Sequence, residues 1–311
     1  MTKRKRIIWV LGGTGYIGRA LVRHLSDDPL NQLHLLLHRH LPLRVLENVS
    51  TFTGSLARID PLWFERYPPD VVFHLARPAG SRRLTRALSA RSGKAANRHL
   101  VHLLSKLDNP PTVIYISGSL VYGPRHAKDP ASENTALQPV AYARYYHQNE
   151  LPWLEARQSG LLDVRFARPG WIIGPNSWFR HFFWEPLQLS GKVPIYGSGK
   201  QLMSMIHLHD GAAMIDALSI YGKRDQDLNI FAGTPIAHKT FCTMLAELTG
   251  CQTMEITEKK LRKEHGSTVA EALTASIPMQ SLYPGIHAKA DTRFPQPEEM
   301  LADAVRLLKD E

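Results

Sequence analysis

Cysteine is scarce in this chain: Cys242 and Cys251 are the only two among 311 residues. Two isolated cysteines exclude a disulfide framework, and neither stands in a metal-ligand spacing, so we expect no metal site and a reducing compartment. The sequence also has no apolar run long enough to span a membrane. Residues 3–6 are basic and precede an apolar stretch, but that stretch is too short for a signal peptide. We therefore expect a cytoplasmic protein without a membrane partner.

Acidic residues are outnumbered, with 28 Asp and Glu against 38 Lys and Arg, a formal net charge of +10. This surplus favours an anionic ligand, such as a phosphorylated cofactor or a nucleic acid. The basic residues are scattered and form no stripe interleaved with aromatics, so we expect no nucleic-acid partner. The length allows one large domain or two coupled domains.

A glycine-rich turn near the start organises the rest of the chain. Apolar residues 7–11 predict a buried strand, and residues 19–25 have the apolar spacing of a helix. A strand, a glycine loop and a helix together form the phosphate-binding unit of dinucleotide-binding folds, in which N–H groups at the helix start hold the pyrophosphate. An ordinary strand-to-helix loop is the alternative. We predict dinucleotide contacts at Gly12, Thr14, Gly15, Tyr16, Ile17 and Gly18.

The second predicted strand, residues 32–40, ends in basic residues. In dinucleotide-binding folds an acidic residue at this position binds the ribose of NAD, whereas an arginine accepts the extra phosphate of NADP. Here the position holds His38 and Arg39, with no Asp or Glu nearby. A guanidinium pairs with phosphate through two hydrogen bonds. We therefore predict NADP(H) as the cofactor, with a solvated basic turn as the alternative.

Strands and helices alternate along the next part of the chain. Residues 49–52, 70–78, 112–119 and 163–170 read as strands, and residues 94–107 and 142–158 as helices. This alternation predicts an α/β fold with a doubly wound parallel sheet of the Rossmann type. Ligands in such sheets lie at the carboxyl ends of the strands, so the glycine loop, Arg39, Ala76, Arg77 and residues 117–119 should converge on one crevice.

The composition changes beyond residue 175, where proline and aromatic residues become frequent around residues 178–184. We predict a dinucleotide-binding domain of residues 1–170 plus about 203–233, and a smaller substrate-binding domain of about 171–202 plus 234–311. Residues 204–208 are expected to be a strand that returns to the sheet, followed by a helix over 211–221 with Asp210 as its N-cap. Helices are also expected over 241–250 and 298–308. The long polar loop 123–138 is typical of a lid or a substrate loop.

Taken together, these residues resemble the extended short-chain dehydrogenase/reductase family, which includes nucleotide-sugar epimerases and dehydratases. The resemblance is carried by the glycine loop, residues 70–76, Asn97, residues 121–123, Tyr142, Arg168-Pro169, Gly174-Pro175, and His207 with Asp210. It implies a Rossmann domain that binds NAD(P), a smaller C-terminal domain over a small-molecule substrate, and a homodimer through the helices that begin near Lys94 and Tyr142. It also implies cofactor contacts from Ser55, Leu56, Leu75, Ser117, Tyr142, Pro169 and Ile172.

The expected active site is atypical for this family. The family uses a Ser or Thr, a Tyr, and a Lys four residues after the Tyr, whose charge stabilises the tyrosinate. Tyr142 stands at the tyrosine position, but Tyr146 replaces the lysine and Gly118 replaces the Ser or Thr. We take Tyr142 and the neighbouring Ser119 as the catalytic candidates. A tyrosine that only packs on the nicotinamide is the alternative for Tyr142.

Three functions are compatible with a site that keeps the family tyrosine but lacks the lysine and the Ser or Thr. The first is an NADPH-dependent reductase of a small carbonyl compound, because reduction needs a proton donor and suffers less from the missing lysine than oxidation does. The first alternative is a nucleotide-sugar epimerase or dehydratase, as the family at large suggests. The second alternative is a non-catalytic protein that senses NADP(H) or regulates a partner.

Overall fold

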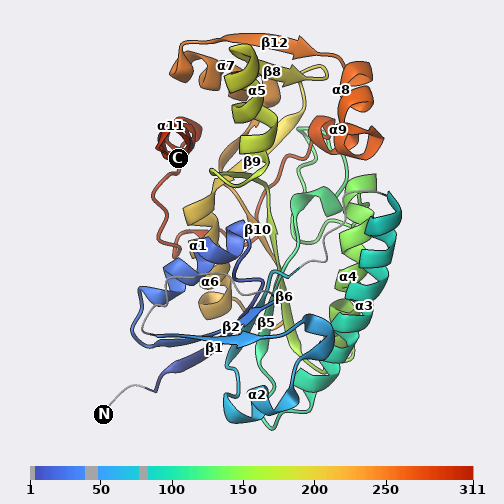
Figure 1. The fold of residues 1–311 in the computed structure, drawn as a ribbon, viewed down its shortest axis with the longest axis vertical. Helices are drawn as coiled ribbons and strands as arrows, with labels where there is room; N and C mark the ends of the chain where they lie inside the picture. Colours follow the sequence, from blue (N-terminus) through green and yellow to red (C-terminus); the bar gives the residue numbers. More distant parts are fainter. Residues whose placement is uncertain (1–3, 39–47, 77–82, 311) are drawn as a thin grey trace.

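The computed structural model describes residues 4–38, 48–76 and 83–310, apart from the side chains of 83–86. Its centre is a seven-stranded sheet in which every neighbouring pair of strands is parallel. The predicted α/β fold with a doubly wound parallel sheet is confirmed (Figure 1). The strand order is β10-β6-β5-β4-β1-β2-β3, formed by β1 Arg6–Leu11, β2 Asn31–Leu37, β3 Val49–Thr53, β4 Val71–His74, β5 Thr112–Ile116, β6 Asp163–Pro169 and β10 Leu228–Ile230.

Helices cover both faces of this sheet (Figure 1). Helices α1, Tyr16–Ser26, and α6, Leu208–Tyr221, pack together on one face. The long helices α3, Arg83–Ser105, and α4, Ala141–Gln158, lie side by side on the other. Successive side chains of a strand point to opposite faces, so Ile8 and Val10 pack under α1 and α6, while Trp9 packs toward α3 and α4. Both faces are therefore buried, which explains why the strands read as almost continuous apolar runs.

The C-terminal part of the chain builds two small sheets of its own. One has the order β11-β9-β7, and the other pairs β12 with β8. Their strands are β7 Trp171–Ile173, β8 Lys192–Tyr196, β9 Leu202–His207, β11 Ala232–Ala237 and β12 Gln252–Ile256. The helices are α5 Glu185–Ser190, α7 His238–Thr249, α8 Glu258–His265, α9 Ser267–Thr274, α10 Pro284–His287 and α11 Pro297–Lys309. Short helices complete the chain: α2 Pro61–Arg66, η1 Leu56–Arg58, η2 Ser119–Val121 and η3 Arg180–Trp184.

Two sequence predictions for this region are wrong. The strand near residues 204–208 does not return to the central sheet, because β9 pairs with β7 and β11 instead. The seventh central strand is β10, whose three residues were too few to give a periodic signal. Asp210 is not the N-cap of α6 either. His207 is the N-cap, and the Asp210 carboxylate accepts the backbone N–H groups of Arg293 and Phe294 at 2.9 and 2.8 Å.

The polar loop 123–138 is fastened to the C-terminal part of the chain. The Arg125 and Ala131 N–H groups donate to the carbonyls of Ser276 and Pro278 at 2.7 and 2.8 Å. The Glu133 carboxylate accepts the Asn229 N–H at 3.0 Å, together with two groups of the segment 281–282. These bonds fix the loop as a packed connection, in contrast to the lid that its length suggested.

Within the described part of the chain, no helix combines the length and the apolar character that a membrane crossing requires. The domain boundaries and the homodimer stay predictions.

His34 on β2 is an ionisable side chain enclosed by aromatic rings. Its ring is fully buried, stacks on Trp9 with a centroid distance of 5.1 Å, and lies 4.6 Å from the Tyr67 ring. Neither ring nitrogen has a hydrogen-bond partner among the described residues. Burial without a partner penalises the charged form and lowers the pKa of His34 from 6.5 to about 4.

His34 makes the free energy of unfolding depend on pH. In the unfolded chain His34 titrates near 6.5, so the unfolded state binds more protons than the folded state between pH 6.5 and 4, and stability is lost as the pH falls through that window. Through His34, the wild type should lose about 2 kcal/mol of its free energy of unfolding between pH 7.5 and pH 5. We expect His34→Phe to lack this loss. Chemical denaturation of the variant and the wild type at pH 7.5 and 5 measures the difference. The same substitution at the exposed His126 is the control, and an equal acid loss in all three proteins would contradict the assignment.

Candidate functional site

The glycine loop between β1 and α1 brings two backbones into contact. Gly12 has a φ of +93°, a conformation that glycine adopts readily, and a Cβ there would lie 2.6 Å from the Ala76 nitrogen. A Cβ at Gly18 would overlap the Gly12 carbonyl oxygen. Only glycines at these two positions let the first turn of α1 sit against the ends of β1 and β4.

The start of α1 is left open to an anion. Gly15 is the N-cap and makes no side-chain capping bond, and no acidic residue stands in the first turn. A Cβ at Gly15 would meet only the Gly12 carbonyl oxygen, at 3.4 Å, so the space in front of the loop is open. Helix N-termini of this kind carry free N–H groups and a partial positive charge. These features fit the pyrophosphate of a dinucleotide.

A cavity of about 260 Å³ lies next to this loop. It connects the first turn of α1 with the carboxyl ends of β5 and β6 and the start of β7. Residues predicted from the sequence as site residues form part of its wall: Tyr16, Ile17, Ser117, Ser119, Tyr142, Pro169 and Ile172. The other described lining residues were not among the predicted catalytic or cofactor-binding residues: Gly118, Leu120, Tyr146, Gly170, Trp171 and Trp178.

The remaining predicted cofactor contacts that the structure describes lie outside the cavity wall. Gly12, Thr14, Gly15 and Gly18 form the glycine loop and the first turn of α1, and Leu75 and Ala76 follow β4. His38 follows β2 and is exposed, and Ser55 and Leu56 begin the short helix η1. The Gly54 N–H donates to the Leu37 carbonyl at 2.8 Å, so the ends of β2 and β3 are adjacent. Arg39 and Arg77 lie outside the described residues.

The serines after β5 both reach the cavity. In a continuous strand, alternation would turn Ser117 and Ser119 away from the direction taken by position 118. However, β5 ends at Ile116 and η2 begins at Ser119, so alternation no longer applies to these residues. Ser117 and Ser119 therefore line the same wall as Gly118. Three neighbouring positions offer two hydroxyl groups, although the family position itself has none.

Tyr142 and Tyr146 stand one turn apart on α4 and both line the cavity. The Tyr142 ring meets Trp178 edge-on at 5.0 Å. The Tyr146 hydroxyl lies 3.6 Å from the position that a Cβ at Gly118 would take. Gly118 and Tyr146, the two departures from the family pattern, are therefore adjacent in the structure. The signal for Tyr146 was its spacing of four residues from Tyr142, which puts both side chains on one helix face.

Among the described residues that line the cavity, none is Lys, Arg, Asp or Glu. The aromatic residues near 178–184 lie in two different places. Trp178 lines the cavity, whereas the others are buried in the C-terminal core: Phe179, Phe182, Phe183 and Trp184.

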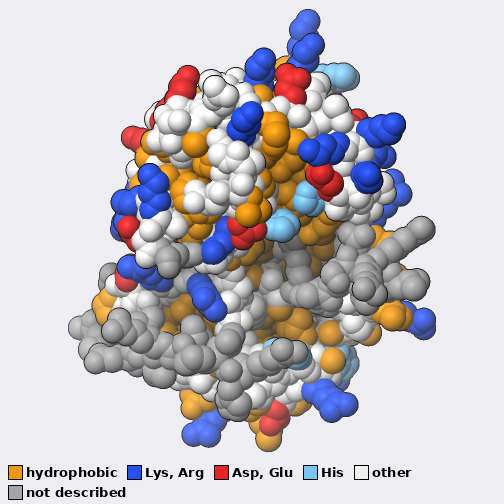
Figure 2. Space-filling view, turned by 45° about the horizontal axis from the view of Figure 1, so that its top comes forward, with side chains coloured by type: hydrophobic (Ala, Val, Ile, Leu, Met, Phe, Trp, Pro, Cys, Tyr) orange, Lys and Arg blue, Asp and Glu red, His pale blue; other side chains and the backbone are white. Residues whose placement is uncertain are grey.

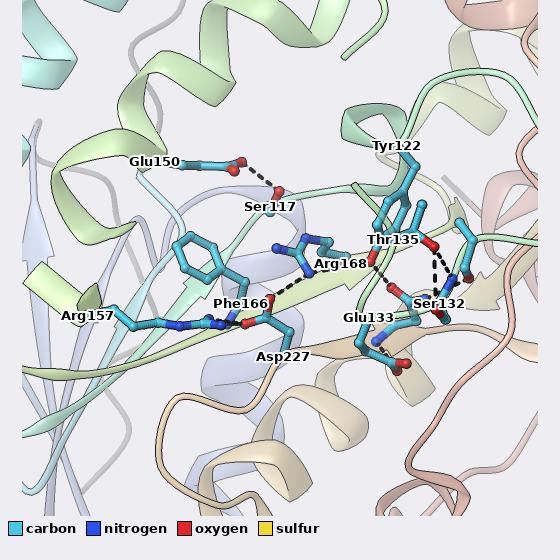
Figure 3. A network of polar contacts seen from close by, with 12 residues as sticks. Ser117, Tyr122, Ser132, Glu133, Thr135, Glu150, Arg157, Phe166, Arg168 and Asp227 are labelled. Carbon is cyan, nitrogen blue, oxygen red and sulfur yellow. Dashed lines mark hydrogen bonds and ion pairs between the residues drawn. The ribbon is translucent and has the colours of Figure 1, made fainter. Parts of the chain in front are cut away.

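A buried polar network fixes the strand ends behind the cavity (Figure 3). The Arg168 guanidinium, on β6, pairs with the Asp227 carboxylate at 2.8 Å and donates to the Tyr122 hydroxyl at 3.3 Å. Tyr122 donates in turn to Asn229 on β10 at 2.6 Å. Burial raises the pKa of Tyr122 to about 12. The network holds β6 against β10, and thereby positions Pro169 at the cavity.

A second buried contact joins α4 to the cavity wall. Glu150 is fully buried, and one carboxylate oxygen accepts the Ser117 hydroxyl at 2.6 Å (Figure 3). The other oxygen lies 3.0 Å from Nδ1 of His147, which is partly exposed. His74, by contrast, is a buried histidine whose Nε2 lies 2.8 Å from the Asn97 amide oxygen.

Basic side chains are dispersed over the molecular face shown in Figure 2. In that view Lys and Arg stand singly around a gathering of apolar side chains in the upper part of the described surface.

Comparison with known proteins places this arrangement among dinucleotide-dependent folds. Residues 8–230 match the model of the NAD dependent epimerase/dehydratase family. No curated protein that was compared matches the chain.

Solved structures with the same fold cover almost the whole chain. A UDP-glucuronic acid 4-epimerase from Bacillus cereus, in complex with UDP-glucuronic acid and NAD, is 16% identical over 98% of this chain and 99% of its own, with a TM-score of 0.79. A dTDP-glucose 4,6-dehydratase from Bacillus anthracis with NAD is 16% identical over 98% and 97%, with a TM-score of 0.77. A human epimerase family protein with NADPH is 17% identical over 96% and 99%, with a TM-score of 0.75.

Proposed function

Since the chain belongs to the NAD dependent epimerase/dehydratase family, we propose that it binds a nicotinamide dinucleotide along its glycine loop and acts on a hydroxyl or carbonyl group held beside Tyr142. The observation that carries this proposal is the position of the cavity. It begins at the first turn of α1 and extends to Tyr142 on α4, so the phosphate-binding loop and the candidate acid belong to one continuous site.

The residues of this chain have distinct parts in such a reaction. The N–H groups at the start of α1 hold phosphate oxygens, and the hydroxyls of Ser117 and Ser119 orient a substrate oxygen by hydrogen bonding. Tyr142 gives a proton to that oxygen or takes one from it. The apolar side chains of Ile172 and Trp178 limit the access of water. When bound, the dinucleotide would supply hydride transfer.

A nucleotide sugar is the first candidate substrate. The family match and the sugar nucleotide in the Bacillus cereus epimerase structure support it. These comparisons favour the nucleotide-sugar epimerase or dehydratase, our first alternative from the sequence, over the carbonyl reductase that we placed first.

Reduction of an uncharged carbonyl compound is the second candidate. It is favoured by the cavity wall, where five of the thirteen described lining residues are aromatic and none is charged. A neutral phenol can donate a proton to the oxygen of a reduced carbonyl, whereas oxidation of an alcohol requires a base.

We propose NADP(H) as the preferred dinucleotide, on the basis of the basic residues after β2. The NADPH in the human epimerase family structure supports this choice, although the two Bacillus structures contain NAD. We expect Arg39→Asp to weaken NADPH binding about 10- to 100-fold and NADH binding much less, because it removes a charge-assisted hydrogen bond to phosphate. Fluorescence titration of both dinucleotides measures the effect. Arg262→Asp on α8 is the charge-matched control, and an equal loss for both dinucleotides would refute the phosphate contact.

Tyr142 is tested by removing its hydroxyl. In Tyr142→Phe we expect kcat to fall about 10²- to 10⁴-fold while the dinucleotide Kd is unchanged, since the lost group transfers a proton. The assays are conversion of UDP-glucose and UDP-glucuronic acid with NAD or NADP, and oxidation of NADPH with benzaldehyde and acetophenone. Tyr145→Phe, which changes a tyrosine outside the cavity wall, is the control.

Each assay result has one interpretation. Sugar-nucleotide conversion without net cofactor change supports the first candidate, and stoichiometric NADPH oxidation supports the second. Tight binding of NADPH without turnover of any of these compounds would contradict both, and would support the non-catalytic sensor.

The two departures from the family pattern can be reversed together. A serine at 118 would approach the Tyr146 phenol, so we pair Gly118→Ser with Tyr146→Lys. We expect the double variant to oxidise an alcohol probe, UDP-glucose or benzyl alcohol, about 10- to 100-fold faster than the wild type, because the lysine charge stabilises a tyrosinate. Tyr146→Phe, which adds no charge, is the control. A double variant that folds and binds NADP but oxidises neither probe faster would refute this account of Tyr146.

A further inference from the structure

Two tryptophans from the C-terminal part of the chain line the cavity beside Tyr142. The Trp178 ring meets the Tyr142 ring edge-on, with a centroid distance of 5.0 Å and an interplanar angle of 78°. The Trp171 ring meets the Trp178 ring edge-on in turn, at 5.8 Å and 66°. The three side chains therefore form a continuous aromatic row that begins at the candidate acid.

The segment that carries the two indoles holds them in fixed positions. Trp171 begins β7, which pairs with β9. The Ser177 hydroxyl donates to the Gly174 carbonyl at 2.8 Å and accepts the Phe179 N–H at 3.1 Å. These two bonds close the turn that holds Trp178. A wall that is already ordered loses little conformational freedom when a ligand packs against it.

The aromatic rings behind these tryptophans are more deeply buried than the tryptophans themselves. Phe182 lies 5.0 Å from the Trp178 ring and is 4% exposed. Phe183 lies 6.5 Å from the Trp171 ring and is fully buried. Trp171 and Trp178 pack on this core but are only half-buried. The core thus supports the two indoles, and part of their apolar surface is left for a ligand of the cavity.

We propose that Trp171 and Trp178 select the substrate by packing against a ring that carries the reacting carbon. This inference rests on the proposed function and adds the class of substrate. The ring is uncharged and offers C–H bonds, as does the arene of an aryl carbonyl compound or the pyranose of a nucleotide sugar. The face of an indole is electron-rich, so it attracts such C–H groups and adds dispersion contacts with the ring.

The contact between Trp178 and Tyr142 links this selection to the chemistry. A ring that packs on Trp178 lies next to the Tyr142 side chain, so an oxygen on its reacting carbon is brought toward the candidate acid. A flexible chain of the same size has no face to pack and loses more conformational freedom on binding. Trp178 is therefore a specificity residue, and Tyr142 remains the group that transfers the proton.

The test replaces each indole by an apolar side chain without a ring, in Trp171→Leu and Trp178→Leu. Trp178→Phe keeps a ring and is the rescue variant. Phe294→Leu is the matched control, because Phe294 is also half-buried and packs on the same C-terminal core but is not among the residues that line the cavity. Trp171→Leu tests the proposal by itself should Trp178→Leu fail to fold.

Ligand-observed NMR measures the Kd of each probe with NADP⁺ and without a dinucleotide, so that no turnover is required. Acetophenone is compared with methyl hexyl ketone, which has the same number of carbon atoms but no ring. UDP-glucose is compared with UDP, which lacks the pyranose. The Kd values of NADPH and NADH and the thermal unfolding midpoint are measured for every variant.

We expect Trp171→Leu and Trp178→Leu to raise the Kd of a ring probe about 3- to 10-fold, and to leave those of methyl hexyl ketone, UDP and NADPH unchanged. A rise for acetophenone identifies the ring as an arene, and a rise for UDP-glucose identifies it as a pyranose. Trp178→Phe should recover most of the affinity, and Phe294→Leu should match the wild type.

An equal rise in Kd for the probe without the ring, or the same rise in Phe294→Leu, would overturn the proposal, because it would show a general loss of packing. A rise confined to NADPH would also overturn it, since the ring on the indoles would then be the nicotinamide. So would a wild type that binds neither acetophenone nor UDP-glucose. A wild type that prefers the ring probes but binds neither NADPH nor NADH would instead overturn the proposed function.

Discussion

The close approach of α1 to the ends of β1 and β4 is the constraint from which the site follows. A Cβ at Gly12 or Gly18 would collide with backbone atoms, so α1 can pack this closely on the sheet only with glycine at these two positions. This close packing directs the N-terminus of α1, which has no side-chain cap, toward the edge where the parallel strands end. The apolar packing of α1 and α6 on one face, and of α3 and α4 on the other, holds the strands in register for it.

The sequence predicted this frame well because its signals are local. The strand, glycine turn and helix of residues 7–25 are neighbours in the chain, and continuous apolar runs mark strands that are covered on both faces. Three-residue strands such as β10 give no periodic pattern, and β8 and β12 are paired across residues far apart in the sequence. The N-cap of α6 was missed for a similar reason. The partners of Asp210 are the N–H groups of Arg293 and Phe294, more than eighty residues away, and no local pattern announces them.

Only part of the candidate site could be predicted from the sequence. Tyr142, Ser117, Pro169 and Ile172 fall on positions fixed by the fold, and the structure brings them to one cavity. Trp171 and Trp178 reach it from a segment whose path depends on the β7–β9 pairing, which sequence periodicity does not reveal. Ser117 and Ser119 both line the cavity because the strand ends at Ile116, a boundary that the apolar pattern of residues 112–119 did not reveal. The Glu150 contact escaped because a charged residue in a helix is ordinarily solvated, and only the tertiary packing of α4 on β5 buries it.

The loss of the family lysine has a consequence for where the negative charge of a reaction can reside. A tyrosinate at position 142 needs a nearby positive charge, and the described residues of the cavity wall supply none. The buried Arg168 is held by Asp227 and Tyr122 behind the wall, where it interacts electrostatically with the buried Glu150 carboxylate. Among the described residues, the charged side chains near the site, Arg168 and Glu150, thus lie behind the cavity wall and do not line it. Such a cavity favours steps in which a neutral hydroxyl hands on a proton over steps that need a permanent ion in contact with the substrate.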